Sequence, residues 1–213
     1  MINSGRTVFS AEGIHFRQTS DISATNWTPI GTASNQFRGN YNGNGRRINL
    51  TMNRASAEGN GVFGFVWGGT IRNLIVDANV TGRNATGAIV GQLAGFSNDW
   101  RGVVMNCVVY GTVTGTERTG GIVGDLRVWG DVRNSYSMAT VTGTSGVGGI
   151  AGYIHNTTSG TNAWIEFCYA TGAINGSTLV GGVIGVNSGI ARNSVALNSS
   201  ITVESSDLWD IGR

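Results

Sequence analysis

An internal repeat constrains the fold of this chain more than any other feature of its sequence. Each copy centres on a glycine that follows two apolar residues, and five copies align on Gly64, Gly91, Gly124, Gly152 and Gly185. Successive glycines are 27, 33, 28 and 33 residues apart. Further along each copy stands an Asn, replaced once by Phe: Asn73, Asn106, Asn134, Phe167 and Asn193. A repeat period between about 20 and 50 residues is typical of solenoids and other stacked architectures.

Each copy holds three short runs rich in Val, Ile, Thr and Tyr, and these runs are bounded by Gly and Asn. None has the i, i+3, i+4, i+7 spacing of a helix, so the runs indicate strands. A single unit cannot bury its apolar face, whereas stacked units place equivalent residues about 4.8 Å apart. We therefore predict an all-β, right-handed parallel β-helix (β-solenoid), with about 28–33 residues and three short strands per coil. An antiparallel sandwich is the alternative, but it does not require the same residue at the same phase of every copy.

The repeat also suggests how the chain is organised. Residues 1–60 follow the repeat loosely and are expected to form irregular N-terminal coils of the solenoid, with strands at 14–17 and 47–51. Residues 61–213 are expected to form five regular coils of the same single domain. The sequence of residues 209–213 resembles the opening of another unit, so we expect the chain to be part of a longer protein.

Two columns of the repeat predict local geometry. Asn tolerates left-handed backbone angles, so a corner is expected at the Asn position, with hydrogen bonds between stacked Asn side chains. Phe167 interrupts that column, and we expect the corner to change in its coil.

One residue later, Cys107 and Cys168 share a column with Ser135 between them. Two coil steps separate the cysteine Cα atoms by about 9.5 Å, beyond the roughly 7 Å that a disulfide allows. Two free, buried thiols are therefore predicted.

Composition excludes several classes of protein. The chain has 35 Gly and one Pro among 213 residues and a net charge of +2, and all its basic residues are Arg. Many glycines without prolines fit tight turns, not collagen or a Pro-rich disordered chain. A charge this small predicts no nucleic-acid partner. No apolar run approaches the roughly 18 residues of a membrane helix, so no membrane insertion is expected.

The repeat resembles a known family. The segments GGIVG…RNSYSMATVTG and GAIVG…NCVVYGTVTG are similar to the GLUG-motif repeat of bacterial surface and secreted proteins, and WTPIG near the N-terminus fits the leader of that family. The resemblance runs from about Phe16 to Thr202, although Asn42 and Arg47 stand where the family usually has Asp and His. It implies a β-helical module of a larger extracellular protein, often an adhesin, and it supplies no catalytic residues.

The residues that could carry chemistry are sparse. His15 and His155 are the only histidines, and neither lies at metal-ligand spacing from a Cys or carboxylate, so no metal or cofactor is predicted. Asp125 and Asp131 flank Trp129 and could approach Asp99 in space. A catalytic or Ca²⁺ site there is an alternative to the favoured interpretation, which is solvated loop charges.

A candidate binding edge follows from loop insertions at 94–102 and 155–164, since insertions in repeat proteins often lie on the binding side. Four tryptophans fall in this region of successive coils, with charged residues beside them. The candidate edge comprises Trp67, Trp100, Trp129, Trp164, Asp99, Arg101, Asp125 and Arg127. Aromatic rings beside charged groups suit sugars, which have apolar faces and polar rims. The opposing interpretation is that these tryptophans only cover the core.

We therefore predict a non-catalytic module of an extracellular or cell-surface protein that acts in adhesion or as a spacer, with a glycan or a cell-surface protein as partner. A polysaccharide-active enzyme is the first alternative. Ice binding on outward Thr columns is the second. These columns contain Thr81, Thr114, Thr142, Asn175 and Thr202, and beside them Asn79, Thr112, Thr140, Ala173 and Ser200.

Overall fold

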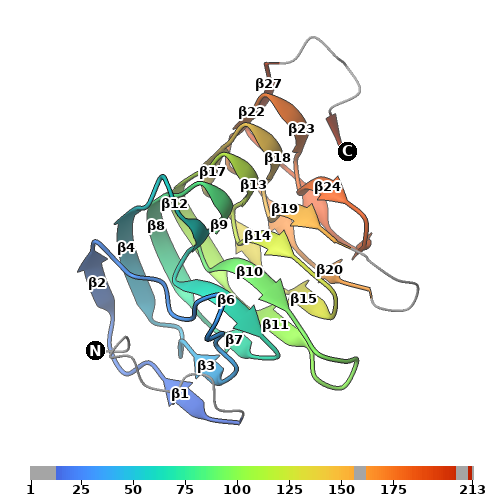
Figure 1. The fold of residues 1–213 in the computed structure, drawn as a ribbon. Coiled ribbons are helices and arrows are strands. Elements are labelled where there is room, and N and C mark those ends of the chain that lie inside the picture. Colours follow the sequence, from blue (N-terminus) through green and yellow to red (C-terminus); the bar gives the residue numbers. More distant parts are fainter. Residues whose placement is uncertain (1–12, 156–161, 205–210, 213) are drawn as a thin grey trace.

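The computed structural model describes residues 13–155, 162–204 and 211–212, and the paired strands within them are parallel. Successive turns of the chain stack on one another, so that strands of equal phase lie side by side in four sheets (Figure 1). This is the all-β, parallel, solenoid-like arrangement that the repeat predicts. The described residues include no helix that is long and apolar enough to cross a membrane.

The four sheets are lettered A to D. Sheet A contains β1 (His15–Arg17), β3 (Asn40–Asn42), β7 (Thr70–Arg72), β11 (Gly102–Met105), β15 (Gly130–Arg133), β20 (Trp164–Glu166) and β25 (Ile190–Arg192). Sheet B contains β2 (Ile22–Thr25), β4 (Arg47–Asn53), β8 (Ile75–Thr81), β12 (Val108–Thr114), β16 (Tyr136–Ser137), β17 (Thr140–Thr142), β21 (Tyr169–Ala170), β22 (Ile174–Gly176), β26 (Val195–Ala196) and β27 (Ile201–Val203). Sheet C contains β6 (Phe63–Trp67), β10 (Val90–Ala94), β14 (Val123–Leu126), β19 (Ala151–Ile154) and β24 (Ile184–Asn187). Sheet D contains β5 (Glu58–Asn60), β9 (Asn84–Gly87), β13 (Glu117–Gly120), β18 (Ser145–Gly148), β23 (Thr178–Gly181) and β28 (Ile211–Gly212).

The register of sheet C confirms the phase of the repeat. The residues just before the repeat glycines pair in order along the sheet: Phe63, Val90, Val123, Ala151 and Ile184. The N-terminal strands join the same stack, since β3 pairs with β7 and β4 with β8. The strands expected at 14–17 and 47–51 correspond to β1 and β4.

The predicted number of strands per coil was wrong, because a coil passes through four sheets and not three. The run around each repeat glycine is divided into a sheet D strand and a sheet C strand by a bend. Gly121 lies in such a bend, between β13 and β14. A Cβ atom there would come within 2.2 Å of the Gly149 carbonyl oxygen and of the Ser137 hydroxyl. The backbone of neighbouring coils therefore approaches too closely at the bend for any side chain.

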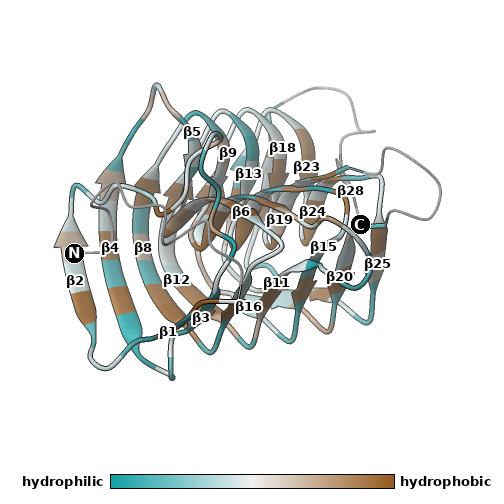
Figure 2. Cartoon of the chain, turned by 60° about the horizontal axis from the view of Figure 1, so that its bottom comes forward, coloured by the Kyte–Doolittle hydropathy of each residue, from teal (hydrophilic) through white to brown (hydrophobic). Residues whose placement is uncertain are grey.

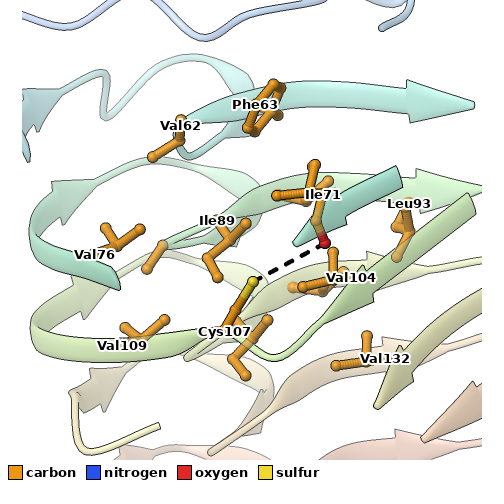
Figure 3. Close-up of a cluster of buried hydrophobic side chains, with 14 of the residues drawn as sticks. Val62, Phe63, Ile71, Val76, Ile89, Leu93, Val104, Cys107, Val109 and Val132 are labelled. Atoms are coloured by element: carbon orange, nitrogen blue, oxygen red, sulfur yellow. Dashed lines mark hydrogen bonds between the residues drawn. The ribbon is translucent and has the colours of Figure 1, made fainter. Parts of the chain in front are cut away.

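The core runs along the inside of the stack. Strands such as β4 alternate buried and exposed residues, and this alternation appears as brown and teal bands in Figure 2. Equivalent inward residues pack on one another from coil to coil, as Val62, Ile71, Val76, Ile89 and Val104 do in the close-up of Figure 3. Burying each such aliphatic side chain contributes about 1.5–3 kcal/mol. Because each coil is covered by its neighbours, this stabilisation extends along the stack.

The corner between sheets A and B has the geometry expected of Asn. Its residues have φ between 48° and 54°: Asn73, Asn106, Asn134, Phe167 and Asn193. Side-chain hydrogen bonds link Asn106 to Asn73 (3.3 Å) and Asn73 to Asn42 (3.1 Å). The expected change of corner at Phe167 was wrong, because Phe167 keeps the left-handed backbone, with φ of 52°, and its ring is 57% exposed. Backbone bonds on either side hold the chain at this corner, such as those from the Asn134 N–H to the Glu166 carbonyl (3.1 Å) and from the Tyr169 N–H to the Ser135 carbonyl (3.4 Å).

The two cysteines are free and buried, as predicted. The Cys107 thiol donates to the Met105 carbonyl (3.2 Å) and lies 4.0 Å from the Ile71 carbonyl, the contact dashed in Figure 3. Between the two cysteines, the Ser135 hydroxyl donates to the Arg133 carbonyl (2.8 Å) and accepts from the Cys107 backbone N–H (3.1 Å). Cys and Ser thus have equivalent roles in this column.

The first prediction concerns Phe167. A left-handed backbone costs a bulky residue about 1 kcal/mol or more, and Asn tolerates it better. Replacing the exposed ring, as in Phe167→Asn, should raise the free energy of unfolding by about 0.5–1 kcal/mol, measured by urea denaturation. The reverse change one coil earlier, Asn134→Phe, is the matched control and should lower it. A Phe167→Asn variant less stable than wild type would contradict this account of the corner.

The second prediction concerns the thiols. Burial raises the pKa of both Cys107 and Cys168 to about 12, so neither is a thiolate at neutral pH. A thiol-reactive dye should therefore label neither cysteine in the folded chain and both in urea, and a reductant should leave the melting temperature unchanged. Rapid labelling of the native protein would show that this column is not packed as described.

Candidate functional site

The four tryptophans of the candidate edge lie together at the corner where sheet C strands lead into sheet A strands. Trp67 ends β6, Trp129 lies in the turn between β14 and β15, and Trp164 begins β20. Trp100 belongs to the loop 95–101, which projects between β10 and β11 (Figure 1). All four are half-buried, so they are neither core residues nor free surface side chains. The predicted clustering on one edge is confirmed. Part of the second insertion, at 156–161, lies outside the described residues.

The first half of the edge is an aromatic group formed by Trp67, Phe96 and Trp100. The Phe96 ring lies 5.7 Å from that of Trp67 and 4.4 Å from that of Trp100. The loop is held by a hydrogen bond from the Phe96 N–H to the Trp100 carbonyl (2.9 Å), and the Trp100 indole N–H donates to the Gly68 carbonyl (2.9 Å). The guanidinium of Arg38 lies 4.9 Å from the Phe96 ring centre. Phe96, which the sequence analysis did not select, is the most exposed member, at 40%.

The second half of the edge alternates arginine and tryptophan. The Arg101 guanidinium lies 5.6 Å from the Trp129 ring and 4.9 Å from the Trp164 ring. Arg192 of the next coil lies 4.9 Å from Trp164 as well. Arg101 also donates to the carbonyls of Gly130 (3.3 Å) and Asn162 (2.9 Å). These contacts tie the loop 95–101 to the two following coils.

Two buried carboxylates, Asp131 and Glu166, support this row of arginines. Asp131 is 2% exposed and lies 4.0 Å from Arg101 and 3.6 Å from Arg133. Glu166 forms an ion pair with Arg192. Burial raises the pKa of Asp131, although Arg133 and Arg101 oppose the shift. Burial likewise lowers the pKa of Arg101, against the effect of Asp131. The prediction that Asp131 is a solvated loop charge was wrong.

Of the remaining predicted members, Asp99 lies on the edge beside Trp100, whereas Asp125 and Arg127 belong to a different group of charges. Asp99 is exposed in the loop 95–101. Asp125 and Arg127 contact each other, through Asp125 Oδ2 and Arg127 Nε at 3.0 Å, and among the described residues neither makes a ring contact with the tryptophans. The expected approach of Asp99, Asp125 and Asp131 does not produce a metal-binding group within the part of the chain that the structure describes.

Asp125 is instead the centre of a second cluster. Its carboxylate is fully buried, 3.3 Å from Arg118 Nη1 and 2.9 Å from His155 Nε2. The His155 ring stacks on Tyr153, with ring centres 4.1 Å apart. Burial alone would raise the pKa of Asp125, but His155 and Arg127 outweigh it and hold that pKa below its ordinary value. The prediction that Asp125 is a solvated loop charge was wrong, because its side chain is fully buried.

The outward Thr columns are in register on sheet B, as the repeat predicts. Thr112 and Val113 pair with Thr140 and Val141, and Asn175 pairs with Thr202. The Thr112 hydroxyl donates to Asn79 Oδ1 (3.4 Å). The columns alternate with buried valines and isoleucines, which is the pattern of any half-buried strand, so register alone does not assign them a function.

Comparisons with known proteins bear on the fold. No model of a known protein family matches the chain, and no curated protein sequence is significantly similar to it. A solved structure from Bacteroides ovatus, described as a "putative immunoglobulin A1 protease", is similar, with 25% sequence identity and a TM-score of 0.70. The similarity covers 89% of this chain and 61% of the other, so this chain spans about three fifths of the protein that it matches.

The third prediction concerns Asp125. Removing one partner of a buried ion pair costs about 3–5 kcal/mol, and the partial exposure of Arg118 and Arg127 favours the lower end. Asp125→Asn should therefore lower the free energy of unfolding by about 3 kcal/mol at pH 7. The carboxylate stabilises the fold above the unfolded pKa of about 4. This contribution is lost as the pH falls through the lowered folded pKa.

Urea denaturation of both proteins between pH 7 and pH 2.5 measures this effect, and the difference between them should shrink below pH about 4. Glu58→Gln is the matched control, because Glu58 pairs with Arg83 at the surface and should contribute less than about 1 kcal/mol. A pH-independent difference would mean that Asp125 acts only through packing.

Proposed function

We propose that this chain is a non-catalytic, right-handed β-solenoid module of an extracellular bacterial surface protein, built from GLUG-type repeats, and that it binds a glycan in adhesion. The observation that supports this most directly is the aromatic group of Trp67, Phe96 and Trp100. These residues come from two coils, lie on the edge that carries the loop insertion, and leave the Phe96 ring 40% exposed.

The surroundings of this group favour sugar binding over simple core cover. Aromatic rings present an apolar face to the C–H groups of a sugar, while neighbouring polar groups bind its hydroxyls. Arg38 supplies donors beside the Phe96 ring. The loop 95–101 is fixed by its own backbone bonds and by Arg101, so little conformational entropy is lost when a ligand binds.

The charged groups of the edge favour binding over hydrolysis. A glycosidase needs two carboxylates that are free to act on the scissile bond from its two sides. Here Asp131 and Glu166 are both buried and both paired with arginine.

An enzymatic role is the second candidate, and the description of the Bacteroides ovatus protein as a protease favours it. Incubating this chain with immunoglobulin A1 and with polysaccharides, followed by product analysis, tests that alternative.

The fourth prediction is that a glycan array will show binding that depends on Phe96. Phe96→Ala should weaken binding of the selected glycan about 10-fold, equivalent to about 1.4 kcal/mol, because a stacking face is lost. Phe167→Ala removes an even more exposed ring away from the edge and should leave the affinity unchanged. Retention of glycan binding by Phe96→Ala together with Trp100→Ala would reject this edge as the site.

A further inference from the structure

The outer face of sheet B carries a shallow hollow that none of the features above explains. Its volume is about 450 Å³, and it lies over β2, β4 and β8. The side chains that line it are short and polar: Ser23, Thr25, Asn49, Thr51, Asp77 and Asn79. The strand register places them in two adjacent outward columns, three residues deep.

The hollow is closed on one side by a wall of larger side chains. On the next strand, β12, Tyr110 stands opposite Asp77, so the column changes from short residues to an aromatic ring. The Arg47 guanidinium lies 3.7 Å from the Asp77 carboxylate and 5.3 Å from the centre of the Tyr110 ring. Arg47 therefore bridges the polar floor and the aromatic wall, and it neutralises the carboxylate on the floor.

A short aromatic strip lies on the following coils, one outward column to the side of Tyr110, because Tyr136 pairs with Val108 and Tyr169 with Tyr136. The rings of Tyr136 and Tyr169 on the following coils are stacked, with centres 4.7 Å apart and planes inclined by 6°. Met138 and Tyr169 are 47% and 37% exposed. The strip therefore flanks the hollow on the later coils and does not extend its two columns.

We propose that this surface is a second binding site, separate from the tryptophan edge, and that it takes a neutral oligosaccharide lying along the axis of the stack. Amides and hydroxyls both donate and accept hydrogen bonds, which matches the hydroxyl groups of a sugar. The one carboxylate on the floor lies beside Arg47, so the floor has little net charge with which to select a charged ligand. Tyr136 and Tyr169 stack on each other, so they present ring edges, and not ring faces, to a ligand that extends past the hollow.

Pre-existing bonds make the floor rigid without exhausting its hydrogen-bonding capacity. Asn49 Nδ2 donates to the Ser23 hydroxyl (3.0 Å), and Asn79 Oδ1 accepts from Thr112 (3.4 Å). These bonds leave Asn49 Oδ1 and Asn79 Nδ2 for a ligand. The site goes beyond the function proposed above, because it stands on sheet B and shares no residue with the edge.

The fifth prediction tests this site with immobilised neutral polysaccharides, namely mannan, β-glucan and galactan, and with polygalacturonate as the charged comparison. The double variant Asn49→Ala/Asn79→Ala should bind the retained neutral polysaccharide at least about 10-fold more weakly, as expected for two lost hydrogen bonds of about 1 kcal/mol each. Both side chains are exposed, so the melting temperature should stay close to that of wild type and serves as the folding control.

Two matched variants separate this site from the edge. Thr114→Ala, an exposed change on β12 outside the hollow, and Phe96→Ala, on the edge, should both keep the neutral-polysaccharide binding. Tyr169→Ala should weaken longer oligosaccharides more than a disaccharide, since only a longer chain reaches the strip. Loss of binding in Phe96→Ala but not in the Asn double variant would overturn this inference and leave the edge as the site. Binding of polygalacturonate alone, or of none of the four, would overturn it as well.

Discussion

The backbone hydrogen bonds that join each coil to the next are the constraint on which this structure depends. One column shows this plainly, because the N–H groups of Ile89, Ile122 and Ile150 donate in turn to the carbonyls of Ile122, Ile150 and Val183 at 2.8 to 3.1 Å. A parallel ladder of this kind cannot shift by one residue without turning every side chain to the opposite face. The register therefore decides which residues are buried, which form corners and which reach the edge.

The same ladder explains why unlike residues can occupy one column. Phe167 has the φ of its Asn neighbours, and Cys107 occupies the place that Ser135 takes one coil later. In both columns the backbone conformation is the same for the two residue types, so it does not depend on the side chain. What the side chain decides is a smaller quantity, such as the strain at the corner or the strength of one hydrogen bond to a carbonyl.

The phase of the repeat was enough to predict the parallel stack, the free thiols, the left-handed Asn corner and the gathering of four tryptophans. Each of these follows from equal positions lying above one another. The division of a coil into four strands was not predicted, because the bend at Gly121 depends on how closely neighbouring backbones approach. The cluster of Asp125, His155 and Arg118 was also missed, since its members come from strands of two sheets and two coils. The repeat period identifies the equivalent residues of successive coils, but it does not identify which outward side chains contact each other across a corner.

The loop 95–101 lengthens one coil while β10 and β11 stay paired with their neighbours on both sides. An insertion at this corner therefore leaves the strand register unchanged, although its side chains contact the neighbouring coils. The sequence of such a loop can therefore change while the strands on both sides of it keep their pairing, as in the binding loops of an antibody domain. It also offers a practical position for grafting a foreign peptide, between Ser97 and Asp99, where the turn points away from the sheets.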